Sequence, residues 1–318
     1  MTRTLSILMA AALALIAGAA CAQESRPVRL IVPVPPGGPT DFAARLIAPR
    51  LGEALGRNVI IDNRPSANGV VGSELGAHAA PDGSTFVLGN SGTHAINPGL
   101  YRKLPYDPDH DFIPVAGTLT SGMVLVANPR VPANTLAEFI SLAKKEPGKL
   151  NIGVAGATGQ LAGEALKVQS QIALNNVLYK GSAPTEFAVL QGEVQVTILT
   201  PIASANHINA GKLKAFGVTS AKRISLLPAI PTIAESGMTG FDFQIWHGMF
   251  APRGTPAKLV QKLNADVQHI LDLPENRDKI SAQGFEIMHY SPREFAVFVK
   301  GEMDKYRKLI QSAGIPQE

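Results

Sequence analysis

Short apolar runs alternate along the chain with longer amphipathic stretches. Val28–Val32 is a β-branched run that predicts a strand, and the apolar spacing from Phe42 to Leu55 predicts a helix that Pro49 should kink or end. Further strands are predicted at 58–62, 85–88, 123–127, 150–154, 194–199 and 214–219, and further helices at 69–80, 136–145, 163–169 and over most of 256–314. Strands separated by helices predict an α/β fold of parallel sheets with helices on both faces.

The first two dozen residues predict an export signal. Arg3 precedes an uncharged run over 5–20, and Ala20-Cys21-Ala22 then offers an A-x-A cleavage site, so we expect cleavage after Ala22 and a periplasmic mature chain. A membrane anchor is disfavoured because about 16 residues are fewer than the roughly 20 that span a bilayer. Acylation of Cys21 is a second alternative, although Gly18-Ala19-Ala20 is a poor approach to such a cysteine.

Composition narrows the class of protein. The 318 residues suffice for two domains, and with 45% hydrophobic and 17% charged residues the chain can bury a substantial core. The net charge of +4 comes without a Lys/Arg run, so we expect no nucleic-acid partner. Cys21 is the only cysteine, and its loss with the signal would exclude disulfides, cysteine metal sites and cysteine nucleophiles.

A glycine-rich turn follows the first predicted strand and opens the first helix. Pro36, Gly37, Gly38, Thr40 and Asp41 belong to it. Glycine lets the main chain approach a ligand closely, and unpaired N–H groups at a helix N-terminus attract a carboxylate or a phosphate. Alternatively, Thr40 or Asp41 simply caps the helix.

A second turn of this kind lies far along the chain, again between a strand and a helix. Its residues are Ala155, Gly156, Ala157, Thr158, Gly159 and Gln160. It also looks like a dinucleotide fingerprint, but the acidic residue expected about 20 positions on is missing from 173–176, so we expect no cofactor. Two such turns far apart suggest that each of two domains contributes one.

Other catalytic and metal-binding patterns are incomplete. Ser91 lacks the glycine that a nucleophile elbow needs two residues later, where Thr93 stands. Asp107, Asp109 and Asp111 imitate a calcium loop without its glycine and final glutamate. The seven histidines show no paired ligand spacing. The sequence therefore predicts no metal site and no enzyme.

Many segments, in one order, resemble the Bug family of periplasmic solute-binding proteins, the receptors associated with tripartite tricarboxylate transporters. They include Arg29–Pro33, Pro36–Asp41, Asp62–Pro65, Ser91–Pro98, Leu104–Asp107, Tyr179–Pro184, Ala210–Leu213 and Trp246–Pro252. The resemblance implies a type II periplasmic binding-protein fold, in which two α/β lobes enclose a ligand cleft. Residues 23–124 and 247–318 would form the first lobe, and residues 125–246 the second.

The resemblance also implies a function and a site. A monomer would capture a small carboxylate by lobe closure and deliver it to membrane permease subunits. The same fold would serve a sensor that feeds a membrane kinase, and an exported enzyme is a weaker alternative. The two glycine turns would hold the carboxylate, with Ser91 and Thr93 lining the cleft and Lys180, Gly181, Ser182 and Thr200 facing it from the second lobe.

Two departures from the family pattern bear on the ligand. The second turn lacks the histidine that usually follows it, and Leu199 stands where the family commonly has an aspartate. An aspartate there would suit a ligand amine. We therefore expect amino acids to be disfavoured and a carboxylate with an apolar body to be favoured.

Overall fold

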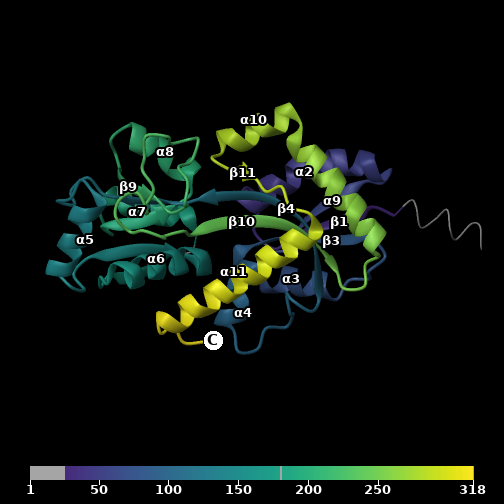
Figure 1. Cartoon of the computed structure of the whole chain (residues 1–318), viewed down its shortest axis with the longest axis horizontal. Helices are drawn as coiled ribbons and strands as arrows, with labels where there is room; N and C mark the ends of the chain where they lie inside the picture. The colour runs from purple at the N-terminus through teal and green to yellow at the C-terminus, as the bar shows by residue number, and fades with distance from the viewer. Residues whose placement is uncertain (1–25, 180, 318) are drawn as a thin grey trace, which may run out of the picture.

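The computed structural model describes residues 26–179 and 181–317, so the expected cleavage site after Ala22 lies outside them. The strands form two sheets, which lie side by side in Figure 1. The six-stranded sheet has the order β11-β4-β10-β3-β1-β2, formed by β1 (Val28–Val32), β2 (Val59–Asn63), β3 (Thr85–Asn90), β4 (Phe112–Gly122), β10 (Gln244–Pro252) and β11 (Glu286–Ile287). The five-stranded sheet has the order β7-β6-β8-β5-β9, formed by β5 (Val124–Ala127), β6 (Asn151–Ala155), β7 (Asn175–Tyr179), β8 (Val196–Leu199) and β9 (Lys214–Val218).

Helices surround each sheet and make two lobes (Figure 1). The lobe of the six-stranded sheet carries α2 (Pro39–Leu55), η1 (Ala67–Gly69), α3 (Val70–Ala77), the π-helical turn η2 (Gly92–Ile96), α4 (Asn97–Leu100), α9 (Ala257–Asp272), α10 (Pro274–Ala282) and α11 (Pro292–Ser312). The other lobe carries α5 (Leu136–Lys145), α6 (Gly156–Ser170), α7 (Ser182–Gln191) and α8 (Pro201–Asn209). Among the described residues, no helix has both the length and the apolarity that a bilayer crossing requires.

Both sheets are mixed, so the expectation of parallel sheets is wrong in part. β1 pairs in parallel with β2 and β3, and β6 with β7 and β8. However, β10 is antiparallel to β3 and β4, and β5 is antiparallel to β8 and β9. The physical reason is that the chain leaves the first sheet along β4 and returns to it along β10, so these strands run against their neighbours.

The two passages between the sheets are joined by hydrogen bonds through Thr219, which is fully buried. The Met123 N–H, between β4 and β5, donates to Thr219 Oγ1 at 2.8 Å, and the hydroxyl donates to the Phe243 carbonyl, just before β10, at 2.6 Å. The Thr219 N–H also donates to the Met123 carbonyl at 2.8 Å. One side chain therefore holds both crossing segments together.

Helix α2 continues past Pro49 to Leu55, where the sequence suggested an interruption. Proline removes one intrahelical hydrogen bond, but Pro49 is exposed while Ile47 and Leu51 are buried beside it. Packing of the inner face therefore keeps the helix continuous.

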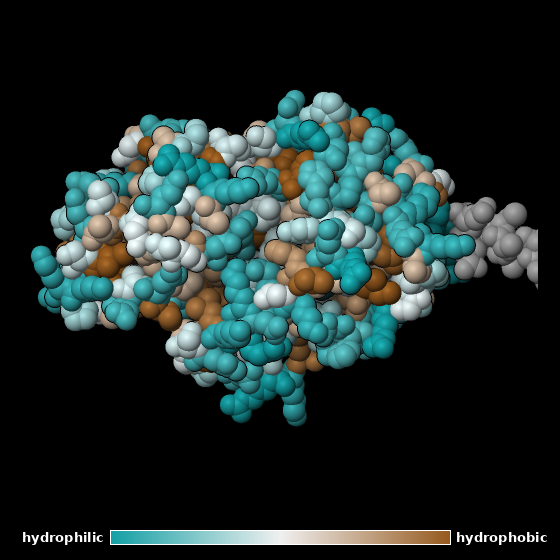
Figure 2. Space-filling view, in the orientation of Figure 1, coloured by the Kyte–Doolittle hydropathy of each residue, from teal (hydrophilic) through white to brown (hydrophobic). Residues whose placement is uncertain are grey.

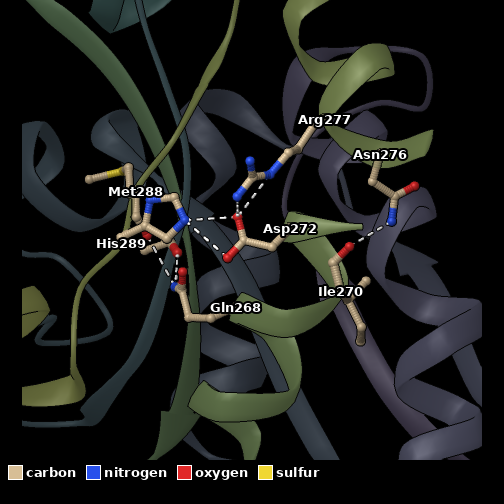
Figure 3. Close-up of polar contacts among 8 residues, drawn as sticks. Gln268, Ile270, Asp272, Asn276, Arg277, Met288 and His289 are labelled. Atoms are coloured by element: carbon tan, nitrogen blue, oxygen red, sulfur yellow. Dashed lines mark hydrogen bonds and ion pairs between the residues drawn. The ribbon is translucent and has the colours of Figure 1, made fainter. Parts of the chain in front are cut away.

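The C-terminal helices α9 and α11 pack back onto the first sheet. Figure 3 shows Asp272, at the end of α9, between Arg277 of α10 and His289, which follows β11. Close by, the Gln268 amide donates to the Met288 carbonyl at 3.1 Å. These bonds fix β11 and the segment after it against α9.

The surface is mainly hydrophilic on the face drawn in Figure 2, where apolar residues form small separate groups. The largest exposed apolar side chains include Leu178 on β7, Phe187 on α7 and Val297 on α11. They come from different elements.

Candidate functional site

A cavity of about 570 Å³ lies between segments of the two lobes. Its wall includes seven residues that the sequence predicted: Thr93, Ala155, Gly156, Ala157, Thr158, Gly181 and Ser182. The rest of the wall is Pro33, Val34, Pro35, Ser66, Ala67, Asn68, Gly69, Asn90, Gly92 and Tyr179. The lobes approach closely here, because a Cβ built on Gly92 would lie 3.4 Å from Thr158 Oγ1.

Every part of this wall lies at the carboxyl end of a parallel strand. The segments 33–35 and 66–69 come after β1 and β2, and the segments 90–93 and 155–158 begin with the last residues of β3 and β6. Residue 179 ends β7, and residues 181–182 follow it. In α/β sheets, ligands bind outside the carboxyl ends of the strands, where loops are free to diverge. The topology thus brings two such edges to face each other.

Two helix N-termini of the second lobe line the cavity. α6 begins at Gly156 and α7 at Ser182, and no side chain caps either helix. The segments 66–69 and 90–93 face it from the other lobe, where the Thr93 N–H donates to Asn90 Oδ1 and the Gly69 N–H to the Ser66 carbonyl. The first four N–H groups of a helix lack intrahelical partners and carry partial positive charge. The cavity wall is therefore suited to an anion.

The described wall contains no formally charged side chain. Its polar groups are hydroxyls, the amides of Asn68 and Asn90, and main-chain N–H groups. Lys180 lies outside the described residues. The described residues would therefore hold an anion through neutral hydrogen-bond donors, whose bonds strengthen when water is excluded.

Part of the wall is apolar. Val34, Pro35 and Ala67 lie on one side, and Ala157 and the ring-bearing Tyr179 on the other. A ligand with a hydrocarbon body between polar ends can bury that body here. The wall is thus amphipathic.

Most of the first glycine turn lies outside the wall: Pro36, Gly37, Gly38, Thr40 and Asp41 do not line the cavity. The turn already holds an anion of its own, because the Asp41 carboxylate accepts hydrogen bonds from the Gly37 N–H at 2.9 Å, from Asn63 at 2.9 Å and from Arg45 at 2.7 Å. Burial by itself raises the pKa of a carboxyl, but the bonds from Arg45, Gly37 and Asn63 outweigh burial and lower the pKa of Asp41 below its usual value. Helix α2 has Gly38 at its N-cap and no side-chain cap, so Asp41 stabilises the turn from the first turn of the helix through the Gly37 N–H and does not occupy the cap position.

Four more predicted residues are also absent from the described wall. Ser91 is buried beside it, Gly159 and Gln160 lie further along the first turns of α6, and Thr200 precedes α8 at the end of β8. A helix turns about 100° per residue, so consecutive residues of α6 cannot all face one cavity. Leu199 is buried in the core of the second lobe.

Sequence reasoning missed ten residues of the wall: 33–35, 66–69, Asn90, Gly92 and Tyr179. The segment 66–69 lies between strand β2 and helix α3, just as each of the two predicted turns lies between a strand and a helix. That position in the sequence is the signal that could have identified this segment as part of the site. Gly69 is required there, since its φ is +72° and a Cβ would lie 2.6 Å from Thr93 Cγ2 and 2.9 Å from the Pro33 carbonyl oxygen.

Comparisons with known proteins agree with this architecture. The model of a family described as the tripartite tricarboxylate transporter family receptor matches residues 43–315. BugT of Bordetella pertussis is 32% identical over 293 residues, which are 91% of this chain and 90% of that protein.

Two solved structures from Rhodopseudomonas palustris are similar over nearly their whole length. Rpa4515 with adipate superposes with a TM-score of 0.83 at 37% identity, covering 92% of this chain and 99% of that one. MatC with bound malate superposes with a TM-score of 0.79 at 33% identity, covering 90% and 99%. The chain therefore belongs to the TctC/Bug family of periplasmic solute-binding receptors of tripartite tricarboxylate transporters, a family of transport receptors and not of enzymes.

Proposed function

We propose that this receptor captures a small dicarboxylate in the cavity between its lobes and delivers it to the permease subunits of a tripartite transporter. The observation that carries the proposal is that the uncapped N-termini of α6 and α7 face the first-lobe segments 66–69 and 90–93 across one cavity. The described residues of its wall carry no formal charge. A ligand that contacts both lobes binds the closed arrangement better than an open one, so it shifts the population toward closure. The permease would recognise that closed form.

The working unit is a monomer whose signal is removed after Ala22. Residues 23–124 and 247–318 form one lobe and residues 125–246 the other. This division is supported by the sheets, since β4 ends at Gly122 and β5 begins at Val124 in the other sheet, and β10 begins at Gln244.

The ligand is a dicarboxylate without an amino group. Relatives bind adipate and malate, and the apolar part of the wall here suits a methylene body. The described wall offers no acidic side chain to balance an ammonium group, which supports the expectation that aspartate and glutamate are disfavoured.

Calorimetric titration of the mature chain tests the ligand class. Adipate or malate should bind, and hexane-1,6-diol, which keeps the chain length of adipate but lacks its charge, should not. Thermal unfolding in each compound gives an independent readout, because a ligand far above its dissociation constant raises the melting temperature. Binding of aspartate more tightly than of either dicarboxylate would contradict the proposed ligand class.

A pair of variants at Ser182 tests the role of the helix N-terminus. Ser182 is the exposed first residue of α7, where proline is tolerated, and the preceding Gly181 has the extended ψ of 171° that proline requires. Ser182→Pro removes the N–H and the hydroxyl, whereas the control Ser182→Ala removes the hydroxyl alone. We expect Ser182→Pro to weaken dicarboxylate binding roughly 10- to 100-fold, the range for one hydrogen bond to a charged group. Equal affinities of the two variants would argue against a role for this N–H.

A further inference from the structure

Asn90 is the polar side chain where β3 ends at the cavity, and its bonding partners fix how its amide is oriented. Its Oδ1 accepts from the Thr93 N–H at 3.1 Å, which identifies the oxygen end of the amide. Its Nδ2 donates to Thr40 Oγ1 at 3.2 Å. No acceptor among residues 26–179 and 181–317 meets the second Nδ2–H. One N–H of a cavity-lining amide is therefore free for a ligand.

Thr40 connects this amide to a histidine deep in the lobe. Thr40 Oγ1 lies 3.1 Å from Nδ1 of His247, which is on β10 and 4% exposed. The Thr40 hydroxyl can accept from Asn90 and at the same time donate its single hydrogen to His247 Nδ1. In that arrangement Nδ1 carries no proton and the proton of the neutral ring is on Nε2, which is buried without a partner in the described part of the chain. Burial lowers the pKa of His247 to about 4, which keeps the ring neutral near pH 7.

The hydroxyl of Thr93, which also lines the cavity, already has hydrogen-bond partners within its own lobe. Thr93 Oγ1 accepts from the Asn90 N–H at 3.0 Å, lies 3.2 Å from the Asn90 carbonyl oxygen and 2.8 Å from His94 Nδ1. The His94 ring is fully buried and stacks on Phe250 with a centroid distance of 3.8 Å. The Thr93 hydroxyl thus stabilises the turn 90–94.

We infer that Asn90 is a ligand-contacting residue that donates its free N–H to a ligand oxygen, and that His247 is its positioning residue, acting through Thr40. The inference rests on the proposed function for the identity of the ligand. It assigns to the first glycine turn a different role from direct binding: Thr40, held by His247, supports the orientation that the Thr93 N–H gives to the Asn90 amide. A reversed Asn90 amide would present an oxygen to the cavity and repel a carboxylate.

The hydrogen-bonded connection from His247 through Thr40 to Asn90, here called the relay, is tested without ligand. In the nitrogen-15 NMR spectrum of the uniformly labelled mature chain near pH 7, the His247 ring should be the Nε2–H tautomer with a bare Nδ1. His247→Gln identifies the resonance by its disappearance. A protonated Nδ1 on His247 would overturn the relay, because Thr40 could then no longer donate to it.

The binding role is tested by calorimetry with adipate and malate. Asn90→Asp keeps the shape but cannot donate, and we expect it to weaken binding at least about tenfold. Thr40→Val keeps the shape of the Thr40 side chain but removes its hydroxyl, so we expect it to weaken binding about five- to tenfold. Thr40→Ser keeps the hydroxyl and should retain most of the affinity.

The outcomes separate the two claims. Wild-type affinity in Asn90→Asp would overturn the contact, and wild-type affinity in a folded Thr40→Val would overturn the positioning role. If the unmodified chain binds neither dicarboxylate, the proposed ligand class fails, while the tautomer of His247 still decides the relay.

Discussion

The hydrogen-bond partners of a single side chain decide whether it serves the fold or the cavity. Asp41 and Asn90 lie near each other in the structure, since Asp41 follows Thr40 and Asn90 donates to Thr40. The Asp41 carboxylate is saturated by three donors of its own lobe, whereas the Asn90 amide keeps one N–H free. Both residue types are common in binding sites, so the sequence could not distinguish these roles.

Replacement of the Asp41 carboxylate should destabilise the first lobe. Asp41→Asn places an NH₂ group opposite Arg45 or Gly37, and we expect a loss of about 2 kcal/mol in the free energy of unfolding at pH 7. The pKa of Asp41 is depressed on folding, so its contribution is present above its usual value of 3.8 and is lost as the pH falls through the lower folded value. Urea unfolding of both proteins at pH 7 and near pH 3 checks this: the difference should shrink at low pH. A difference that grows on acidification would contradict the assignment.

At the scale of elements, strands and helices with regular patterns could be predicted and the irregular ones could not. Val28–Val32 and Leu136–Lys145 have the expected bounds because a β-branched run and a helical period dominate there. β4 contains Pro114 and Gly117, and its register with β10 shifts at His247–Gly248 and at Met249–Phe250. Such bulges break the two-residue alternation on which strand prediction depends. Helix α6 begins seven residues earlier than predicted, at Gly156, because its small residues carry almost no periodic signal.

The long C-terminal helix depends on a local signal at its start. Ser291 caps α11, accepting from the Glu294 N–H at 3.3 Å, while the Glu294 carboxylate accepts from the Ser291 N–H at 2.8 Å. Ser291→Ala should lower the free energy of unfolding by about 1 kcal/mol. Ser312→Ala, at the other end of the same helix, is the matched control, because Ser312 caps no N–H group and should change stability little. Thermal unfolding compares them, and equal effects would contradict the capping role.

At the scale of the whole molecule, the site depends on how two sheets face each other. The sequence identified turns after strands in each lobe, and the structure brings 90–93 and 155–158 to one wall. What no local pattern specifies is the approach of the lobes, which depends on the crossing segments and on α11, which also contacts α6 (Figure 1). That is why Asn68 and Tyr179 were missed: each matters only once the opposite lobe is in place.

The hydroxyl of Thr219, which bonds both segments that connect the lobes, should contribute to the free energy of unfolding. Thr219→Val leaves the buried Met123 N–H without its partner, so we expect the free energy of unfolding to fall by about 1–3 kcal/mol. Thr219→Ser keeps the hydroxyl and should lose less. Urea unfolding measures both effects, and a Val variant as stable as the Ser variant would show that these hydrogen bonds contribute little.

A crystal structure of the mature chain with bound adipate tests the central claim most directly. The account predicts that the carboxylates lie in the cavity between the lobes, within hydrogen-bond distance of N–H groups at the start of α6 or α7 and of donors in the segment 90–93. Adipate bound outside this cavity, or held by groups of one lobe alone, would contradict it.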